Sequence, residues 1–415
     1  MRGGDVRESL LLGNRQLWSL GSVVLIRSIG FGATWPFMAI FFERDLGVPI
    51  YLVGLIFGAL AVASTFCQIA GGYLTDFSGR KRTMLYGSGA GIIIYMGIIA
   101  ALYLHGSTEL IVVMFVATSV SGGLLFPAAT AMVADVTSSR EREKGYAIYR
   151  IMANFGWAVG PLIGSQIFNS GVIWIFAVVE VTLLIQFALI VTLISAIRPA
   201  GGRPAAYRMK RLSDLIVLDR PLMIFSAGTL LLMVLTAQFS VTLPLYATLK
   251  AGIASNLIGY IFAVNGVVVV VGQFPVTAVV GRMREIDGVI VGILLYMAGY
   301  LMVGLSTTLP ALMFDMVVIT LGENFTTPTI SSIVSRIAPS DKIGRYMAFN
   351  GMARSAGRAM GPAAGSFFLY LLFSSNLLIW LALEVFGVLS LLIMIAIRQR
   401  GLVEMEHRET KVQHV

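Results

Sequence analysis

The segment Gly72-Tyr-Leu-Thr-Asp-Phe-Ser-Gly-Arg-Lys-Arg-Thr-Met-Leu85 is a short polar stretch between two long apolar runs. Each flanking run is long enough to cross a bilayer, so the segment predicts a tight turn at one membrane face. Its three consecutive cations, Arg80 to Arg82, place this turn in the cytoplasm, because short loops rich in Lys and Arg are retained there. Glycines at 72 and 79 permit a sharp turn, and Asp76 adds one anion.

The composition is that of a polytopic membrane protein. Of the 415 residues, 57% are hydrophobic and only 12% are charged, and 44 are glycine. A water-soluble core of this length does not need so much apolar surface, so we expect an all-α membrane protein. The single cysteine, Cys67, excludes an intrachain disulfide. Residues 1–15 are too weakly apolar for a cleaved signal peptide, so the first apolar run is expected to remain as a helix.

Runs of about 20 mostly apolar residues predict twelve transmembrane helices in two groups of six. The first six are expected near residues 18–42, 51–74, 84–104, 110–136, 145–167 and 172–197. The second six are expected near residues 221–250, 257–280, 289–306, 311–337, 344–373 and 376–397. The basic, Pro- and Gly-rich segment between them predicts a cytoplasmic linker. The expected domains are a first bundle (1–197), the linker (198–220), a second bundle (221–397) and a cytoplasmic tail (398–415).

The distribution of cations predicts that both termini lie in the cytoplasm. With that orientation, Arg44 and Lys250 fall in outer loops, and Arg27, Arg150, Arg354 and Arg358 fall inside spans. All of the remaining residues among the 30 Lys and Arg then lie in the termini, the inner loops or the linker. The formal charge of +9 is therefore explained by membrane topology and attraction to anionic lipid, and it requires no nucleic acid.

An internal duplication supports two pseudo-symmetric bundles. A shift of 201 residues places Pro127 on Pro328 and the run Gly156 to Ser165 on Gly357 to Ser366. Shifts of 205 and 204 superpose Gly54 on Gly259 and Glu180 on Glu384. Small residues thus recur in register in both halves, which is typical of transporters built from repeats.

The spacing G-x-L-x-D-x-x-G-R-K in the Gly72 turn resembles the loop signature between the second and third helices of the major facilitator superfamily. In that family the loop helps to latch the two halves when the path is closed to the cytoplasm. The resemblance implies a gating loop made of Gly72, Asp76, Gly79, Arg80, Arg82 and Asp135. Asp76 would then face the start of the eleventh helix near Gly344, and Arg80 would pair with Asp135. The alternative is an ordinary basic inner loop, and Phe77 departs from the family pattern, as does the degenerate counterpart at 281–284.

The fifth helix carries Gly156-x-x-x-Gly160-Pro161-x-x-Gly164-Ser165, which resembles a motif of the superfamily's exporters. Glycines four residues apart allow a neighbouring helix to approach, and a proline permits a bend. The eleventh helix repeats the pattern, so plain small-residue packing is an equally physical reading. The predicted helix-bending set is Gly156, Gly160, Pro161, Gly164, Gly357, Gly361, Pro362 and Gly365. An arginine motif of proton-coupled exporters is absent from the fourth helix, where Phe115, Ser119 and Ser121 stand at its positions.

Ionisable side chains inside spans are candidate functional groups because burying a charge in a membrane is costly. Glu323 lies near the middle of the tenth helix, and Arg354 and Arg358 lie one turn apart in the eleventh. Glu323 is either a proton carrier or half of a permanent ion pair. Arg27 in the first helix either binds an anionic substrate group or hydrogen-bonds to a neighbouring helix.

Polar and aromatic side chains on the helices that line the cavity in this superfamily complete the expected site. The substrate-cavity candidates are Arg27, Trp35, Phe126, Gln238, Phe239, Tyr246, Asn265, Asn324, Phe325, Arg354 and Arg358. Glu180 and Glu384 lie in peripheral helices and are left without an assigned role. Motifs of soluble hydrolases and nucleotide-binding enzymes are missing, so we expect neither an enzyme nor a metal or other cofactor.

The resemblance implies a transporter of the twelve-helix drug:proton antiporter type, working by alternating access in the cell membrane. The leading hypothesis is proton-coupled export of amphiphilic small molecules by a monomer, with Glu323 as the protonation site. A metabolite, sugar or lysolipid carrier working by uniport or import is the alternative, and a receptor built on a transporter fold is a third. The sequence does not select the substrate or the coupling ion.

Overall fold

The computed structural model describes residues 14–138, 141–196, 219–339 and 342–401, and every regular element in these residues is a helix. A helix satisfies its own backbone N–H and C=O groups, which an apolar solvent requires because no water is present to do so. The all-α fold class predicted from hydropathy is therefore confirmed.

The elements form twelve spans, as predicted, with ends that mostly agree to within one helical turn. The first six spans are α2 (Arg15–Ile40) with the π-helical turn η1 (Phe41–Asp45), α3 (Ile50–Ser78), α4 (Arg80–Tyr103), α5 (Thr108–Ala117) with α6 (Ser119–Val136), α7 (Arg142–Phe168) and α8 (Val172–Leu193). The last six are α9 (Arg220–Thr236) with η3 (Ala237–Phe239) and α10 (Thr242–Leu249), η4 (Ser255–Leu257) with α11 (Ile258–Val280), α12 (Glu285–Val303), α13 (Leu309–Ile337), α14 (Ile343–Leu371) and α15 (Asn376–Arg400).

The turn expected over residues 72–85 is much shorter in the structure. Helix α3 continues to Ser78 and α4 begins at Arg80, so only Gly79 separates them. The φ angle of Gly79 is +88°, a conformation that glycine adopts without strain. The predicted boundaries at 74 and 84 were wrong because polar residues end an apolar run without ending a helix.

Two spans are interrupted where the sequence predicted continuous helices. The fourth span breaks at Thr118, whose hydroxyl donates to the carbonyl of Phe115. The seventh span passes from α9 through the 3₁₀ turn η3 to α10. There the side-chain amide of Gln238 donates to the carbonyls of Val234 at 2.7 Å and Gly361 at 3.0 Å. A buried side chain thus bonds to the carbonyl of Val234 at the break and joins it to α14.

The chain divides into two compact units. The first contains Met1–Phe41, Ala59–Ala206 and Ser255–Gly266, and the second contains Phe42–Gly58, Tyr207–Ala254 and Val267–Val415. The start of α3 thus packs with the second unit, and the start of α11 packs with the first. The predicted linker at 198–220 lies outside the described residues except for its last two positions, so its role stays a prediction, as does that of the tail from residue 402 onward.

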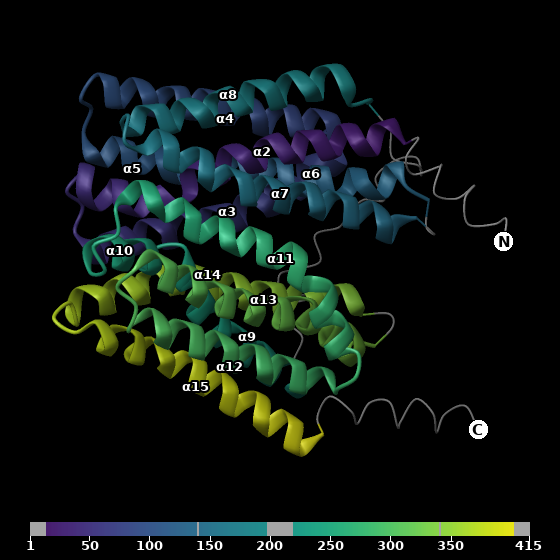
Figure 1. Cartoon of the computed structure of the whole chain (residues 1–415). Coiled ribbons are helices and arrows are strands. Elements are labelled where there is room, and N and C mark those ends of the chain that lie inside the picture. The colour runs from purple at the N-terminus through teal and green to yellow at the C-terminus, as the bar shows by residue number, and fades with distance from the viewer. Residues whose placement is uncertain (1–13, 139–140, 197–218, 340–341, 402–415) are drawn as a thin grey trace. The chain divides into compact units, whose positions relative to one another are not determined.

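Within each unit, the helices pack along one another lengthwise (Figure 1). In the first unit, α2 packs along α7 and α8, and α4 packs along α6 and α8. Leu20, Val23, Met84 and Met132 are fully buried in the core that these helices share. In the second unit, α9 packs along α14 and α15, and α12 packs along α13 and α15.

The glycine motif of α7 forms its contact with α2. A Cβ atom on Gly156 would lie 2.8 Å from the carbonyl oxygen of Leu25, and one on Gly160 would lie 2.5 Å from that of Ile29. Neighbouring backbones therefore approach so closely that no side chain fits between them. The equivalent glycines of α14 make the same kind of contact with α9, since a Cβ on Gly357 would lie 2.3 Å from the carbonyl oxygen of Leu230.

A glycine from another helix packs against the proline of each motif. In the second unit, a Cβ on Gly54 of α3 would lie 2.1 Å from the carbonyl oxygen of Pro362. In the first unit, a Cβ on Gly259 of α11 would lie 2.1 Å from the carbonyl oxygen of Pro161. The pairing of Gly54 with Gly259 in the sequence repeat therefore corresponds to the same packing contact in both units. Bending at the prolines stays a prediction.

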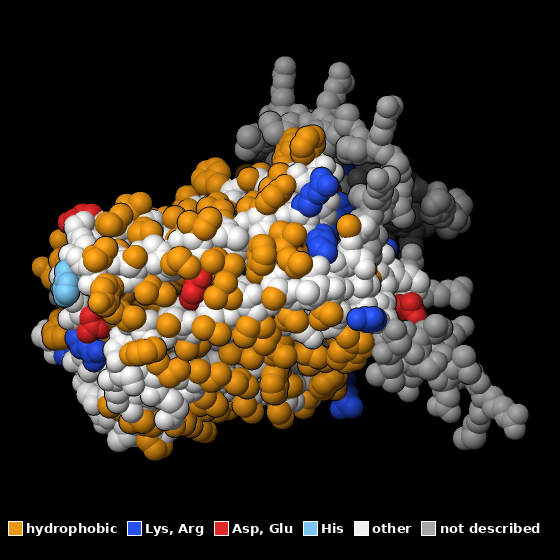
Figure 2. Space-filling view, turned by 90° about the horizontal axis from the view of Figure 1, so that it is seen from above, with side chains coloured by type: hydrophobic (Ala, Val, Ile, Leu, Met, Phe, Trp, Pro, Cys, Tyr) orange, Lys and Arg blue, Asp and Glu red, His pale blue; other side chains and the backbone are white. Residues whose placement is uncertain are grey.

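Ten of the spans are long and apolar enough to cross a membrane on composition alone. Helices α7 and α14 fall outside that set because their glycines and charged residues lower their hydropathy. On the face shown in Figure 2, hydrophobic side chains cover most of the middle and charged side chains lie mainly toward the two ends. This pattern is that of a surface in contact with lipid tails.

We expect Gly160→Ala to destabilise the protein, because its methyl group must enter the space occupied by the α2 backbone. Overpacking of this kind costs about 1–3 kcal/mol and would lower the thermal unfolding midpoint in detergent. Gly351→Ala is the matched control, since nothing lies within 4 Å of its added Cβ, and it should leave the midpoint unchanged or slightly raised. Equal midpoints for the two variants would contradict the α2–α7 contact.

Candidate transport sites

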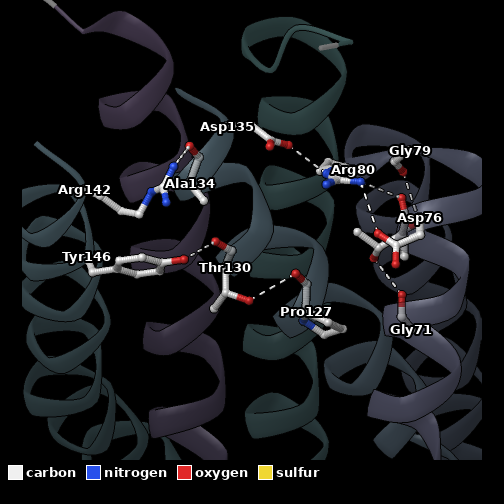
Figure 3. A network of polar contacts seen from close by, with 12 residues as sticks. Gly71, Asp76, Gly79, Arg80, Pro127, Thr130, Ala134, Asp135, Arg142 and Tyr146 are labelled. Carbon is white, nitrogen blue, oxygen red and sulfur yellow. Dashed lines mark hydrogen bonds and ion pairs between the residues drawn. The ribbon is translucent and has the colours of Figure 1, made fainter. Parts of the chain in front are cut away.

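A polar cluster in the first unit joins the ends of α3, α4 and α6 around Arg80 (Figure 3). The Arg80 Nε atom donates to Asp135 Oδ2 at 2.7 Å, and Nη1 donates to the carbonyl of Thr75 at 3.2 Å. Asp76 Oδ1 lies 3.5 Å from Nη1. The Arg80 side chain is only 13% exposed, so its charge depends on these partners. The expected pairing of Arg80 with Asp135 is therefore present.

Other side chains in this region bond to carbonyl groups near helix ends. Tyr146 donates its hydroxyl to the carbonyl of Thr130 at 3.1 Å, and Arg142 reaches the carbonyl of Ala134 at 3.5 Å (Figure 3). Lys81 donates to the carbonyl of Val191 near the end of α8 at 2.8 Å. The last carbonyls of a helix lack intrahelical partners, so Arg142 and Lys81 stabilise the ends of α6 and α8.

The remaining gating-loop residues make fewer contacts. Arg82 is exposed, and a Cβ on Gly72 would meet nothing within 4 Å. The expected approach of Asp76 to the start of the eleventh helix joins different units and stays a prediction, as does the gating role of the whole loop.

The second unit has an equivalent cluster with the charges reversed, which the sequence had not indicated. Glu285, the first residue of α12, pairs with Arg336 near the end of α13 at 3.1 Å and accepts from Ser332 at 2.6 Å. The sequence comparison had stopped at the degenerate residues 281–284. The sequence signal for this pair begins at the next residue, Glu285. In the repeat, Glu285 aligns with Arg80 and Arg336 aligns with Asp135.

Glu323 lies in the membrane-spanning part of α13, among titratable side chains from other helices. Its charge interacts with the hydroxyl groups of Tyr296 and Tyr300 on α12. Arg354 on α14 also interacts with Tyr296. Tyr296 therefore lies within electrostatic range of both Glu323 and an arginine, while a direct ion pair between Glu323 and Arg354 or Arg358 stays a prediction.

The two arginines of α14 differ in their partners. Arg354 Nε is buried and has no hydrogen-bond acceptor among the described residues. Arg358 donates to Ser355 Oγ at 3.1 Å and approaches the sulfur of Met233 at 3.9 Å. Neither contact neutralises a positive charge, so α14 carries two cations whose charges interact with each other.

Arg27 occupies a separate cluster in the first unit. Its guanidinium lies 4.3 Å from the ring centroid of Phe31, and Nη1 donates to Ser121 Oγ at 3.3 Å. The hydroxyl groups of Tyr95 and Tyr149 interact with its charge. Among the described residues, no carboxylate pairs with Arg27. The exporter motif of the fourth helix has a glycine at the position of Ser121. In this chain, the serine at that position contacts Arg27.

The other cavity candidates divide into two groups. Gln238, Tyr246 and Asn324 are buried, and their side chains bond to helix backbones: Gln238 as described above, Asn324 to the carbonyl of Val268 at 3.1 Å, and Tyr246 to that of Gly304 at 3.4 Å. Phe126 is 52% exposed. Half-buried positions are occupied by Trp35, Phe239, Asn265 and Phe325. A cavity-lining role stays a prediction for all of them.

Tyrosines are the site residues that sequence reasoning missed. Tyr95 and Tyr149 accompany Arg27, and Tyr296 and Tyr300 accompany Glu323. The available signal was the spacing of Tyr296 and Tyr300, which lie one turn apart in an apolar helix. No group of three or more metal-ligating side chains occurs in the part of the chain that the structure describes.

Helical units with repeated glycine motifs and charged side chains inside apolar spans define a polytopic membrane protein. A crystal structure of the peptide transporter POT has the same fold, with a TM-score of 0.74 over 92% of this chain and 94% of that one, at 17% identity. The family model described as Major Facilitator Superfamily matches residues 20–362 and 239–411. The chain therefore belongs to the Major Facilitator Superfamily and is one of its transporters.

Three curated relatives match this chain over most of their own length. The uncharacterized MFS-type transporter YttB of Bacillus subtilis is 26% identical over 82% of this chain and 85% of its own. The Na(+), Li(+), K(+)/H(+) antiporter of Planococcus maritimus is 25% identical over 80% and 84%. The multidrug resistance protein MdtH of Aeromonas hydrophila is 24% identical over 91% and 94%.

We expect the Arg80–Asp135 contact to show a coupling energy of about 1 kcal/mol in a double-mutant cycle of Arg80→Ala and Asp135→Ala. Each single variant should be destabilised, because it leaves one partly buried charge with fewer partners. Arg82→Ala is the control for loss of a cation from the same loop, and it should not couple to Asp135→Ala. Additive effects of the Arg80 and Asp135 variants on thermal unfolding would exclude the pairing.

Proposed function

We propose that this transporter is a proton-coupled exporter of amphiphilic small molecules that works by alternating access, with Glu323 as the proton-binding carboxyl group. The observation that carries the proposal is the position of Glu323 within a membrane-spanning helix, where its charge interacts with the hydroxyl groups of Tyr296 and Tyr300 of α12. An ionisable group is expensive at that depth, so its presence indicates a function that needs the charge.

The geometry supports a simple exchange at this site. Glu323 of α13 and Arg354 of α14 both interact with the hydroxyl group of Tyr296. Protonation of Glu323 would remove one of the two opposite charges that act on Tyr296. That change in local charge is the kind of event that shifts the balance between two packed arrangements of a bundle.

The names of two relatives agree with proton-coupled export. One is named a multidrug resistance protein and another a cation/H⁺ antiporter. The glycine contacts of α7 and α14 supply close-packed helix interfaces of the kind that rigid-body alternating access requires. We also propose a cell-membrane location with both termini in the cytoplasm, which the distribution of Lys and Arg supports.

We expect Glu323→Gln to abolish substrate-dependent proton movement in proteoliposomes under an imposed proton gradient. The amide has the size of the carboxyl group but cannot exchange a proton. The measurement is the internal pH while lipophilic cations and neutral drugs are added. Glu109→Gln, an exposed carboxylate on α5, is the matched control and should transport normally. Normal proton movement in Glu323→Gln would reject the proposed role of this residue.

A second candidate function is a carrier for anionic metabolites or lysolipids, and Arg27 is the observation that favours it. Its guanidinium lies within a membrane span and has a serine hydroxyl and an aromatic ring as neighbours, but no carboxylate among the described residues. A phosphate or carboxylate group of a substrate would supply the missing negative charge.

If that second function is correct, Arg27→Gln will lose the binding of anionic amphiphiles, and Arg27→Lys will retain part of it because the charge remains. The measurement is competition by anionic, neutral and cationic amphiphiles for uptake of one labelled substrate. Arg150→Gln on α7 removes another arginine from a predicted span, and its exposed position makes it the control. Competition by anions that is unchanged in Arg27→Gln would leave the exporter as the better function.

A further inference from the structure

Gln68 of α3 is an exposed amide inside a membrane span. It lies about 15 Å before the end of α3 at Ser78, because a helix rises 1.5 Å per residue, and that depth is near the middle of an apolar core. Its Nε2 donates to Ser64 Oγ, one turn earlier in the same helix, at 3.2 Å. The amide makes no other hydrogen bond to the residues that the structure describes, so its carbonyl oxygen and its second N–H can still bind a ligand.

The exposed side of α3 at Gln68 is not the side that faces lipid. Four exposed side chains recur every three or four residues and form one apolar stripe: Val62, Phe66, Ile69 and Tyr73. Gln68 follows Phe66 by two residues, and two residues turn a helix by about 200°, so the amide lies on the other side. An amide among lipid tails would lack hydrogen-bond partners, which is costly, so this second exposed side is expected to meet water.

Gln273 of α11 occupies the equivalent position in the second unit. The shift of 205 residues that superposes Gly54 on Gly259 also superposes Gln68 on Gln273. Nε2 of Gln273 donates to Thr277 Oγ1, one turn away in its own helix, at 3.2 Å. An exposed apolar stripe again runs along another side of the helix: Val267, Val271, Phe274 and Ala278. Both units therefore contain an amide, a hydroxyl group one turn away and a separate apolar stripe.

Contacts with a neighbouring helix fix the depth of Gln68. Cys67, the preceding residue, has its Sγ 3.8 Å from Ser119 Oγ at the start of α6. The same turn of α6 carries Ser121, which accepts from Arg27 at 3.3 Å. Gln68 therefore lies at the level of Arg27 in the first unit.

The depth of Gln273 follows from the equivalent contact in the second unit. A Cβ on Gly272, the preceding residue, would lie 2.7 Å from Nδ2 of Asn324 in α13. Asn324 directly follows Glu323 in the chain. Each unit thus has a neutral amide at the depth of a charged side chain for which a function is proposed.

We propose that Gln68 and Gln273 contact the transported molecule, and that each hydrogen-bonds to an uncharged polar group of it, an amide or a hydroxyl. The inference rests on the proposed transport of amphiphilic molecules and names the neutral group that such a substrate carries. A carboxamide donates and accepts, so it fits a group that does the same, whereas an arginine only donates and an ionised carboxylate only accepts. The hydroxyl groups of Ser64 and Thr277 hold the two amides when no substrate is bound.

The first test is the labelling of introduced cysteines in proteoliposomes by a charged, water-soluble thiosulfonate added on both sides of the membrane. The background is Cys67→Ser, which removes the single native cysteine. The reagent attacks the thiolate, which forms in water and not among lipid tails. We expect Gln68→Cys and Gln273→Cys to be labelled. Ile69→Cys and Phe274→Cys are the matched controls and should stay unlabelled, because they adjoin the glutamines and are exposed but belong to the apolar stripes.

The second test is inhibition by decanamide of the transport of one labelled amphiphile in proteoliposomes. In Gln68→Leu and in Gln273→Leu, the decanamide concentration for half inhibition should rise about three- to tenfold, as expected for loss of a neutral hydrogen bond. N,N-dimethyldecanamide should show a smaller rise, because it has no N–H to donate. Gln166→Leu is the control for loss of an exposed glutamine from another helix, α7, and should leave both inhibition curves unchanged.

Two results would overturn the position of the amides: unlabelled cysteines at 68 and 273, or labelling at 69 and 274 as strong as at the glutamine positions. Unchanged inhibition by decanamide in both leucine variants would overturn the contact with substrate. The labelling requires no transport. It therefore separates failure of this inference from failure of the proposed function, which is tested by proton movement in Glu323→Gln.

Discussion

Direct contact of helix backbones at the glycines of α7 and α14 is the interaction on which each unit depends. Gly160 contacts the backbone of α2, and Gly361 contacts that of α9, with no room for a side chain at either position. Helices in lipid gain little from the hydrophobic effect, so association relies on such close packing and on polar contacts. The same contacts place Arg27 of α2 and Arg358 of α14 in their bundles, because both side chains project from helices that the glycines hold in register.

The repeat keeps these small residues and changes the charges around them. Glu285 at the start of α12 and Arg336 at the end of α13 agree with the dipoles of their helices, whereas Arg80 and Asp135 at the equivalent helix ends oppose them. The first pair is supported by helix dipoles, and the second depends on its own hydrogen bonds. A pair that its surroundings do not favour is the easier one to break, which suits a loop with a proposed gating role.

The two units also differ in the polar groups inside their spans. In the first unit Arg27 lies among tyrosines and a serine, and the second unit has the half-buried Glu323 and Arg354 and a ladder of aromatic side chains. The aromatic ladder passes from Tyr296 through Tyr300 to Trp380, and so it crosses from α12 to α15. The proposed proton chemistry belongs to the second unit, and the alternative proposal, recognition of an anionic substrate by Arg27, belongs to the first.

The sequence by itself determined the number of spans, the family and the recurrence of small residues, because hydropathy and spacing are properties of the linear chain. It also predicted the Arg80–Asp135 contact, since the resemblance to a family motif implied that these two helix ends lie close together. It did not predict the single-residue turn at Gly79, the charge-reversed pair at Glu285, or the breaks at Thr118 and after Thr236. Only the tertiary structure showed that Gln238 and Asn324 bond to helix backbones and that Tyr300 donates to the carbonyl of Thr236 at the break in the seventh span. The physical reason is that a polar side chain in a membrane takes its role from the groups that surround it, and neighbouring helices bring those groups from distant parts of the chain.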